Sequence, residues 1–203
     1  MKNFLLVTIV LFLSANILAQ DSKAYIGVGL GYAMPGGDAM IGVDNGMDLG
    51  IVNFGYRFDE NWGATINLVS SGHTLEATTD VAWGLAYFGV GPMYTTSLSD
   101  NISLDVKPQA ALGMVGVYVV ESNSANSVLG LDGAQVKGSG FVLGNSLVFG
   151  SERGLKFSVN FDYLFGNWKT TTYTDGSSFD WNNVGYATAM SKLSLGLGLR
   201  FNF

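Results

Sequence analysis

The chain has 203 residues and a mass of 21.6 kDa, enough for one domain or at most two small ones. Apolar residues make up 48% and charged residues only 13%, so the composition fits neither a disordered segment nor an ordinary soluble domain. The 28 glycines argue against a mainly helical protein, and the absence of cysteine excludes disulfides and thiolate chemistry. The net charge of −6 argues against nucleic acid as a partner, because the chain repels phosphate backbones.

The beginning of the chain has the layout of a secretory signal peptide. Lys2 precedes an apolar run from Phe4 to Leu13, which small residues follow. The run is too short to cross a bilayer as a helix. We therefore expect a cleaved signal peptide over 1–19 and one mature domain over 20–203. A retained anchor helix is the alternative.

Beyond the leader, apolar and polar residues alternate in eight segments, each bounded by turn-forming residues. No run reaches the roughly 18 apolar residues of a transmembrane helix. The period of two predicts β-strands. The predicted strands are 24–34, 47–58, 63–72, 81–95, 102–120, 136–149, 155–168 and 190–203.

The last segment shows the two faces most clearly. Leucine and phenylalanine occupy every second position from Leu193 to Phe203, and serine, glycine, arginine and asparagine lie between them. An eight-stranded barrel has an interior only wide enough for side chains, so large apolar residues outside and small polar ones inside suit lipid surroundings. We therefore expect an all-β, eight-stranded antiparallel up-and-down transmembrane barrel. A secreted soluble barrel or sandwich, with the apolar face inside, is the alternative.

The predicted connections alternate in length. Those after the second, fourth and sixth strands are short and polar, and those after the first, third, fifth and seventh are longer. This alternation is typical of outer-membrane barrels with short periplasmic turns and longer extracellular loops.

The leader, the eight strands and the ending Leu193–Phe203 resemble the outer-membrane β-barrel domain family, the small barrels of the OmpA and OmpX type. The resemblance is closest to the version common in Bacteroidetes-type bacteria. Leu199, Phe201 and Phe203 resemble the signal that the outer-membrane insertion machinery reads. The resemblance implies a monomer in the cell outer membrane of a Gram-negative envelope, with lipid, lipopolysaccharide and that machinery as partners. It implies no activity, because the family hosts adhesins, assembly factors and enzymes.

Six charged residues fall on the predicted inner face. Because isolated charges in a narrow, mostly dry interior cost several kcal/mol each, we expect them to pair and to plug the lumen. A narrow, porin-like channel is the alternative reading. The six residues of this polar cluster are Arg57, Asp105, Lys107, Lys156, Asp162 and Arg200.

Toward the loop end the predicted inner positions become apolar. They either fill the lumen or line a pocket for a hydrophobic ligand. Which residues of segment 81–95 face inward is not decided by the alternation, because its glycines permit a bulge. The residues of this group are Trp83, Leu85, Tyr87, Val115, Val117 and Leu164.

The single histidine, His73, lies near Ser71 and Glu76, residue types that a lipid-modifying barrel enzyme would use. The spacing matches no known motif, so we expect an exposed loop histidine, no catalytic residues, no metal and no cofactor. Asp44 and Asp48 belong to a predicted solvated acidic rim of loop residues. The sequence therefore favours a structural or surface-binding barrel that is not an enzyme.

Overall fold

The computed structural model describes residues 23–76, 78–120, 133–151 and 153–203, so the predicted signal peptide lies outside the described residues. No helix in this described part is long and apolar enough to cross a membrane. The described elements are β1 (Ala24–Gly36), a short 3-10 helix η1 (Asp38–Met40), β2 (Val43–Arg57), β3 (Trp62–Leu75), β4 (Thr78–Ser99), β5 (Ile102–Val120), β6 (Gln135–Phe149), β7 (Gly154–Thr172), β8 (Ser178–Asp180) and β9 (Ala189–Asn202).

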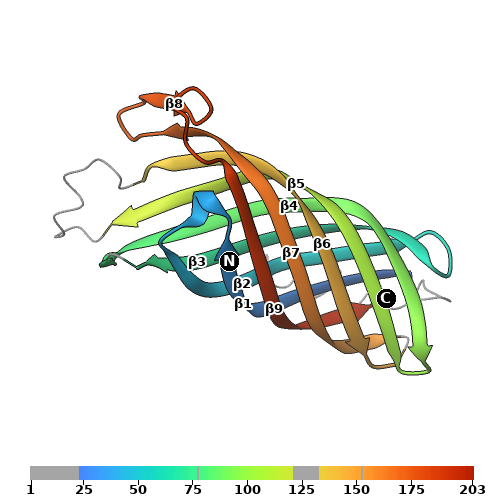
Figure 1. Cartoon of the computed structure of the whole chain (residues 1–203). Helices are drawn as coiled ribbons and strands as arrows, with labels where there is room; N and C mark the ends of the chain where they lie inside the picture. The colour runs from blue at the N-terminus through green and yellow to red at the C-terminus, as the bar shows by residue number, and fades with distance from the viewer. Residues whose placement is uncertain (1–22, 77, 121–132, 152) are drawn as a thin grey trace, which may run out of the picture.

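Eight of the strands in the described chain form one closed antiparallel ring (Figure 1). Strands β1 to β7 pair in sequence order, and β9 closes the ring by pairing with β7 on one side and β1 on the other. The short β8 pairs only with Thr170–Thr172 at the end of β7. Closure leaves the eight-stranded ring itself without an open edge, which lipid surroundings require. The predicted eight-stranded up-and-down barrel is confirmed.

The short turns lie at one end of the barrel. β2 and β3 are joined through 58–61, where the Asp59 carboxylate accepts hydrogen bonds from the backbone N–H groups of Asn61 at 2.8 Å and Trp62 at 2.7 Å. These two bonds favour the charged carboxylate and lower the pKa of Asp59 below its usual value. An Asp at this position fixes the turn through the same bonds.

The opposite end carries the loops, with one correction. Residues 37–42 and 173–188 form longer connections, as predicted. The connection after the third strand is short, because β3 continues to Leu75 and β4 already begins at Thr78. Residue 76 is therefore part of a tight hairpin rather than of a long loop.

Two of the register shifts decide which side chains of β2 and β5 face the lumen. One lies between Gly50 and Val52 in the pairing of β2 with β3. The other lies between Ala111 and Met114 in the pairing of β5 with β6, where Gly113 has a φ of +58°. An extra residue in one strand reverses the alternation beyond it, so each shift exchanges the inner and outer faces.

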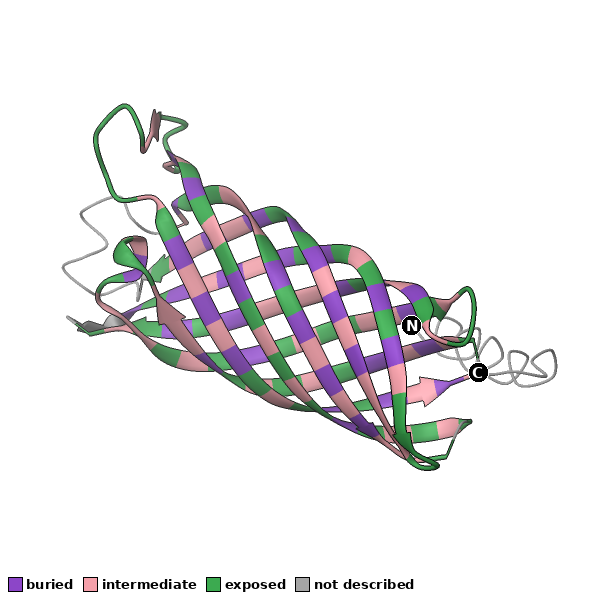
Figure 2. Ribbon diagram, turned by 45° about the vertical axis from the view of Figure 1, so that its right-hand side comes forward, coloured by how far each residue is buried: buried purple, intermediate pink, exposed green. Residues whose placement is uncertain are grey.

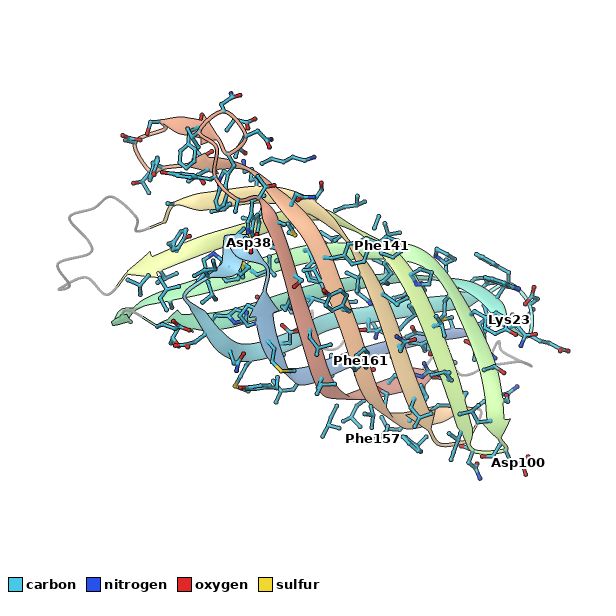
Figure 3. All side chains as sticks on the ribbon, in the orientation of Figure 1. Lys23, Asp38, Asp100, Phe141, Phe157 and Phe161 are labelled. Carbon is cyan, nitrogen blue, oxygen red and sulfur yellow. The ribbon has the colours of Figure 1, made fainter. Side chains whose placement is uncertain are left out.

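The outside of the ring is apolar. Burial alternates along every long strand (Figure 2), and Phe141, Phe157 and Phe161 project away from the barrel (Figure 3). Leu197, in the middle of β9, is 55% exposed. Soluble proteins rarely expose an apolar surface of this extent, so the belt faces lipid. The apolar face lies outside the ring, which contradicts the soluble alternative.

Candidate functional site

The lumen at the turn end is crossed by an ion pair between Arg200 on β9 and Asp105 on β5. The two strands are not neighbours in the ring, so the pair spans the interior. Asp105 also accepts a 2.8 Å hydrogen bond from the Thr95 hydroxyl, and the Arg200 guanidinium carbon lies 4.4 Å from the centre of the Tyr25 ring. Both charged side chains are buried, and the bonds around them offset the loss of hydration.

A hydrogen-bonded chain lies beside this pair. The Lys107 ammonium donates to the Ser146 hydroxyl at 2.6 Å, and that hydroxyl donates to the Asn160 side-chain oxygen at 2.7 Å. Asp162 lies two residues further along β7, and its Oδ1 has no hydrogen-bond partner within the described residues. These groups fill the lumen with polar side chains from β5, β6 and β7.

A second ion pair, which the sequence analysis missed, lies on the loop side of the first. The Lys192 ammonium is 2.5 Å from an Asp48 carboxylate oxygen, and the Ser194 hydroxyl donates to the other oxygen of that carboxylate. Lys192 also contacts the Ser71 hydroxyl at 3.5 Å and lies 5.5 Å from the centre of the Tyr87 ring. The side chain of Lys192 is 1% exposed and that of Asp48 is 10% exposed, so the pair is buried in the lumen.

The predicted rim position of Asp48 is wrong. Strict alternation would put Asp48 on the face opposite to Asn53, but the register shift after Gly50 brings both to the inner face, so Asp48 lies in β2 with its carboxylate in the lumen. Lys192 shares the inner face of β9 with Ser194 and Arg200. The alternation of the last segment predicts this inner position, because Lys192 lies two residues before Ser194.

An apolar layer fills the lumen nearest the loops. Trp83 and Trp168 meet edge to face with ring centres 5.9 Å apart. Met40, carried by η1, closes the layer from the loop side. The buried residues of this layer are Met40, Trp83, Leu85, Tyr87, Ala111, Met114, Val136, Val142, Leu164, Trp168 and Met190.

Four of the residues predicted for the upper lumen belong to this layer, namely Trp83, Leu85, Tyr87 and Leu164. Val115 and Val117 do not, and their predicted inward position is wrong. The bulge at Gly113 turns Met114 into the lumen instead, and the outer face continues to Val119, which is 55% exposed.

The other predicted residues lie toward the turns. Arg57 and Lys156 line a cavity at this end. Leu199 faces outward, the Phe201 and Phe203 rings stack 6.5 Å apart, and the backbone N–H of Phe203 donates to Ala24. Recognition of these last residues by the insertion machinery stays a prediction.

His73 is buried, at 4% exposure, rather than exposed in a loop. Its Nδ1 donates to the backbone carbonyl of Asp44 at 2.9 Å, its ring packs 5.5 Å from that of Trp83, and its Nε2 has no hydrogen-bond partner in the described chain. Within the described residues, neither ring nitrogen contacts a serine hydroxyl, so no pairing of base and nucleophile is formed there. Among the residues that the structure covers, no group of three or more His, Asp or Glu side chains is placed to hold a metal ion.

Solved structures with the same fold include two with clear overall likeness. Neisserial surface protein A has a TM-score of 0.56 at 10% identity, covering 89% of this chain and 97% of its own. OprG from Pseudomonas aeruginosa has a TM-score of 0.52 at 12% identity, covering 91% and 99%. The attachment invasion locus protein Ail of Yersinia pestis has a TM-score of 0.49 at 14% identity, covering 90% and 100%.

This chain has the fold of the small outer-membrane β-barrels. With its apolar belt turned outward, it is a barrel of the outer membrane. No family model matches the sequence, and no curated protein matches it either. The narrower resemblance to the Bacteroidetes-type version therefore stays a prediction.

Proposed function

We propose that this outer-membrane barrel has a structural or surface-binding role, and that it neither conducts solutes nor catalyses a reaction. The observation that carries the proposal is the filled lumen. Two buried ion pairs and an apolar layer with two tryptophans occupy successive levels of the interior.

Opening a path through these levels is costly. Separating a buried pair leaves an uncompensated charge, which costs about 3–5 kcal/mol when one partner is removed. An eight-stranded barrel also has little bore beyond its own side chains. The geometry of His73 supplies no nucleophile, so lipid-modifying chemistry is not part of the proposal.

The connection between β7 and β9 is the best candidate surface for an external partner. It projects beyond the barrel rim with β8 (Figure 1) and holds rings that contact one another, including Phe179 against Tyr186 at 5.9 Å and Trp181 against Tyr186 at 6.1 Å. The Trp181 indole N–H donates to Thr171 at 2.8 Å, which ties the loop to β7. Aromatic side chains that are held rigid and exposed, such as Tyr186, are typical of interaction surfaces.

The proposed partners are therefore envelope components around the barrel, lipid and lipopolysaccharide, and an outside partner at this aromatic loop. A monomer suffices for both roles, because ring closure satisfies every strand edge within one chain.

Conductance tests the closed lumen. Purified protein inserted into a planar bilayer is expected to leave the current at baseline, while a large porin inserted in the same way gives steady channels. Steady single-channel steps from this protein would contradict the proposal, and a porin-like role would replace it.

A further inference from the structure

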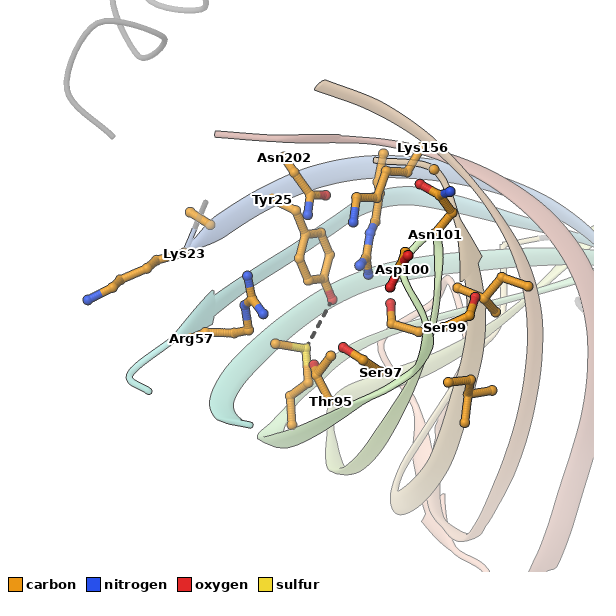
Figure 4. A pocket seen from close by; sticks show the side chains of 17 residues that line it. Lys23, Tyr25, Arg57, Thr95, Ser97, Ser99, Asp100, Asn101, Lys156 and Asn202 are labelled. Atoms are coloured by element: carbon orange, nitrogen blue, oxygen red, sulfur yellow. Dashed lines mark hydrogen bonds between the residues drawn. The ribbon is translucent and has the colours of Figure 1, made fainter. Parts of the chain in front are cut away.

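The turn end of the lumen holds a cavity of about 380 Å³, lined by Arg200 and by residues of the turn between β4 and β5. Figure 4 shows its lining, with Tyr25, Arg57, Asp100 and Lys156. Its volume falls within the ~300–1,000 Å³ range typical of small-molecule sites. The proposed closed-barrel role does not use this cavity.

The charges that line the cavity are mostly positive. Arg57 on β2, Lys23 just before β1, Arg200 on β9 and Lys156 on β7 come from four consecutive strands of the ring, and Asp100 is the acidic residue of the lining. The lining thus carries four basic side chains and one acidic one, with Arg200 paired to the buried Asp105, whereas the whole chain carries −6. A concave site lined by one sign of charge concentrates anions of the opposite sign.

Arg200 forms the inner wall of the cavity and is held in place. It is 8% exposed, its Nη1 is engaged by Asp105, and its guanidinium lies over the Tyr25 ring. Its Nε is buried and has no hydrogen-bond partner within the described residues. A guanidinium held in this way contributes a fixed positive charge to the inner wall of the cavity.

We propose that this cavity binds a phosphate group, carried either by a small soluble ester or by the headgroup of a phospholipid in the inner leaflet. Arginine presents donors in the fork that matches phosphate oxygens, and lysine adds compact positive charge. Two of each around one cavity suit a group that carries up to two negative charges. The hydroxyl groups of Ser97 and Ser99 on the same wall add neutral donors.

Amide NMR of the full protein in a maltoside detergent, which contains no phosphate, tests the proposal with glycerol 3-phosphate as the probe. Saturable shifts are expected in the backbone amides of 97–101 and 200–202, and they weaken as salt is added. Lys156→Gln is expected to weaken binding by about tenfold or more, because a charge-assisted hydrogen bond is lost. Lys169→Gln, the same change on the loop side of β7, is the matched control and leaves binding unchanged.

Absence of saturable shifts, or equal affinity of the wild type and Lys156→Gln, would overturn the proposal. If Lys156→Gln fails to give a folded spectrum, Arg57→Gln replaces it. Weaker binding by that variant is then expected, and an affinity equal to that of the wild type would overturn the proposal. Lys156→Arg keeps the charge and is expected to retain binding.

Nanodiscs distinguish the two sources of the phosphate. In discs of a phosphate-free glycolipid, binding of added glycerol 3-phosphate supports a soluble ester. If the same amides are already shifted in phosphatidylglycerol discs and the ester no longer binds there, the headgroup is the natural occupant. Unshifted amides in both kinds of disc, with and without the ester, would contradict the phosphate site. The conductance experiment is independent of all these results.

Discussion

At the scale of single residues, the buried Asp48–Lys192 pair is a sensitive point of the lumen. The Asp48 carboxylate accepts hydrogen bonds from the Lys192 ammonium and the Ser194 hydroxyl, and the Lys192 side chain is 1% exposed. A buried pair of this kind adds little net stability compared with apolar residues, yet loss of one partner is severe. Single variants therefore test the cost of removing one partner, and a double variant tests whether the pair as a whole adds stability.

Asp48→Asn is expected to lower the free energy of unfolding by about 3–5 kcal/mol, because Lys192 stays buried without its counter-ion. Urea unfolding in lipid vesicles, followed by tryptophan fluorescence, measures the change. Asp38→Asn, in the exposed first loop, is the control and keeps the wild-type midpoint. The double variant Asp48→Leu with Lys192→Met is expected to recover most of the loss. Equal midpoints for Asp48→Asn and the wild type would show that the pair is not buried.

Periodicity alone assigned Asp105, Lys107 and Arg200 to the inner face, and the structure places all three in the lumen. It could not assign Asp48, because the register shift after Gly50 is a property of the pairing of β2 with β3 and leaves no mark in the local sequence. The inward position of Lys192 could have been predicted from the sequence, because the alternation of the last strand continues to it without interruption.

At the scale of elements, the bulge in β5 decides which residues form the apolar layer. The predicted bounds 102–120 coincide with those of β5, and the alternation holds from Asp105 to Gln109. Beyond Gly113 the faces exchange, so Met114 enters the lumen and Val115 leaves it. Gly113 is one of 28 glycines, and its positive φ, which seven other described glycines share, is seen only in the structure.

Gly113→Ala is expected to destabilise the barrel by about 1–2 kcal/mol, because a residue with a Cβ is strained at positive φ. No atom lies within 4 Å of an added Cβ there, so the cost is backbone strain rather than collision. Gly84→Ala on β4, where the nearest atom lies at an ordinary 3.8 Å and φ is not positive, is the matched control. Thermal unfolding in detergent compares the two. A Gly113→Ala variant as stable as Gly84→Ala would show that the bulge is not fixed by its conformation.

At the scale of the whole molecule, the barrel reverses the arrangement of a soluble protein. The large apolar residues of β7 and β9 lie outside, and ion pairs, amides and hydroxyls lie within. This arrangement follows from the period of two, the even number of segments and the small interior of an eight-stranded ring. The loop end was less predictable, because its features depend on irregular backbone. They are the packing of Met40 from η1 against the apolar layer and the ring contacts among Phe179, Trp181 and Tyr186.

The outward orientation of the apolar belt is the claim on which the rest depends, and spin labelling tests it most directly. The chain has no cysteine, so Leu197→Cys and Phe161→Cys each give a single labelling site on the belt, and Val184→Cys gives one in the last loop. In lipid vesicles, both belt labels are expected to be relaxed by oxygen, which dissolves in lipid, and shielded from a water-soluble nickel chelate. The Val184 label is expected to be relaxed strongly by the nickel chelate and only weakly by oxygen. Relaxation of the Leu197 label by the nickel chelate, to the level of the loop label, would contradict the membrane-spanning barrel.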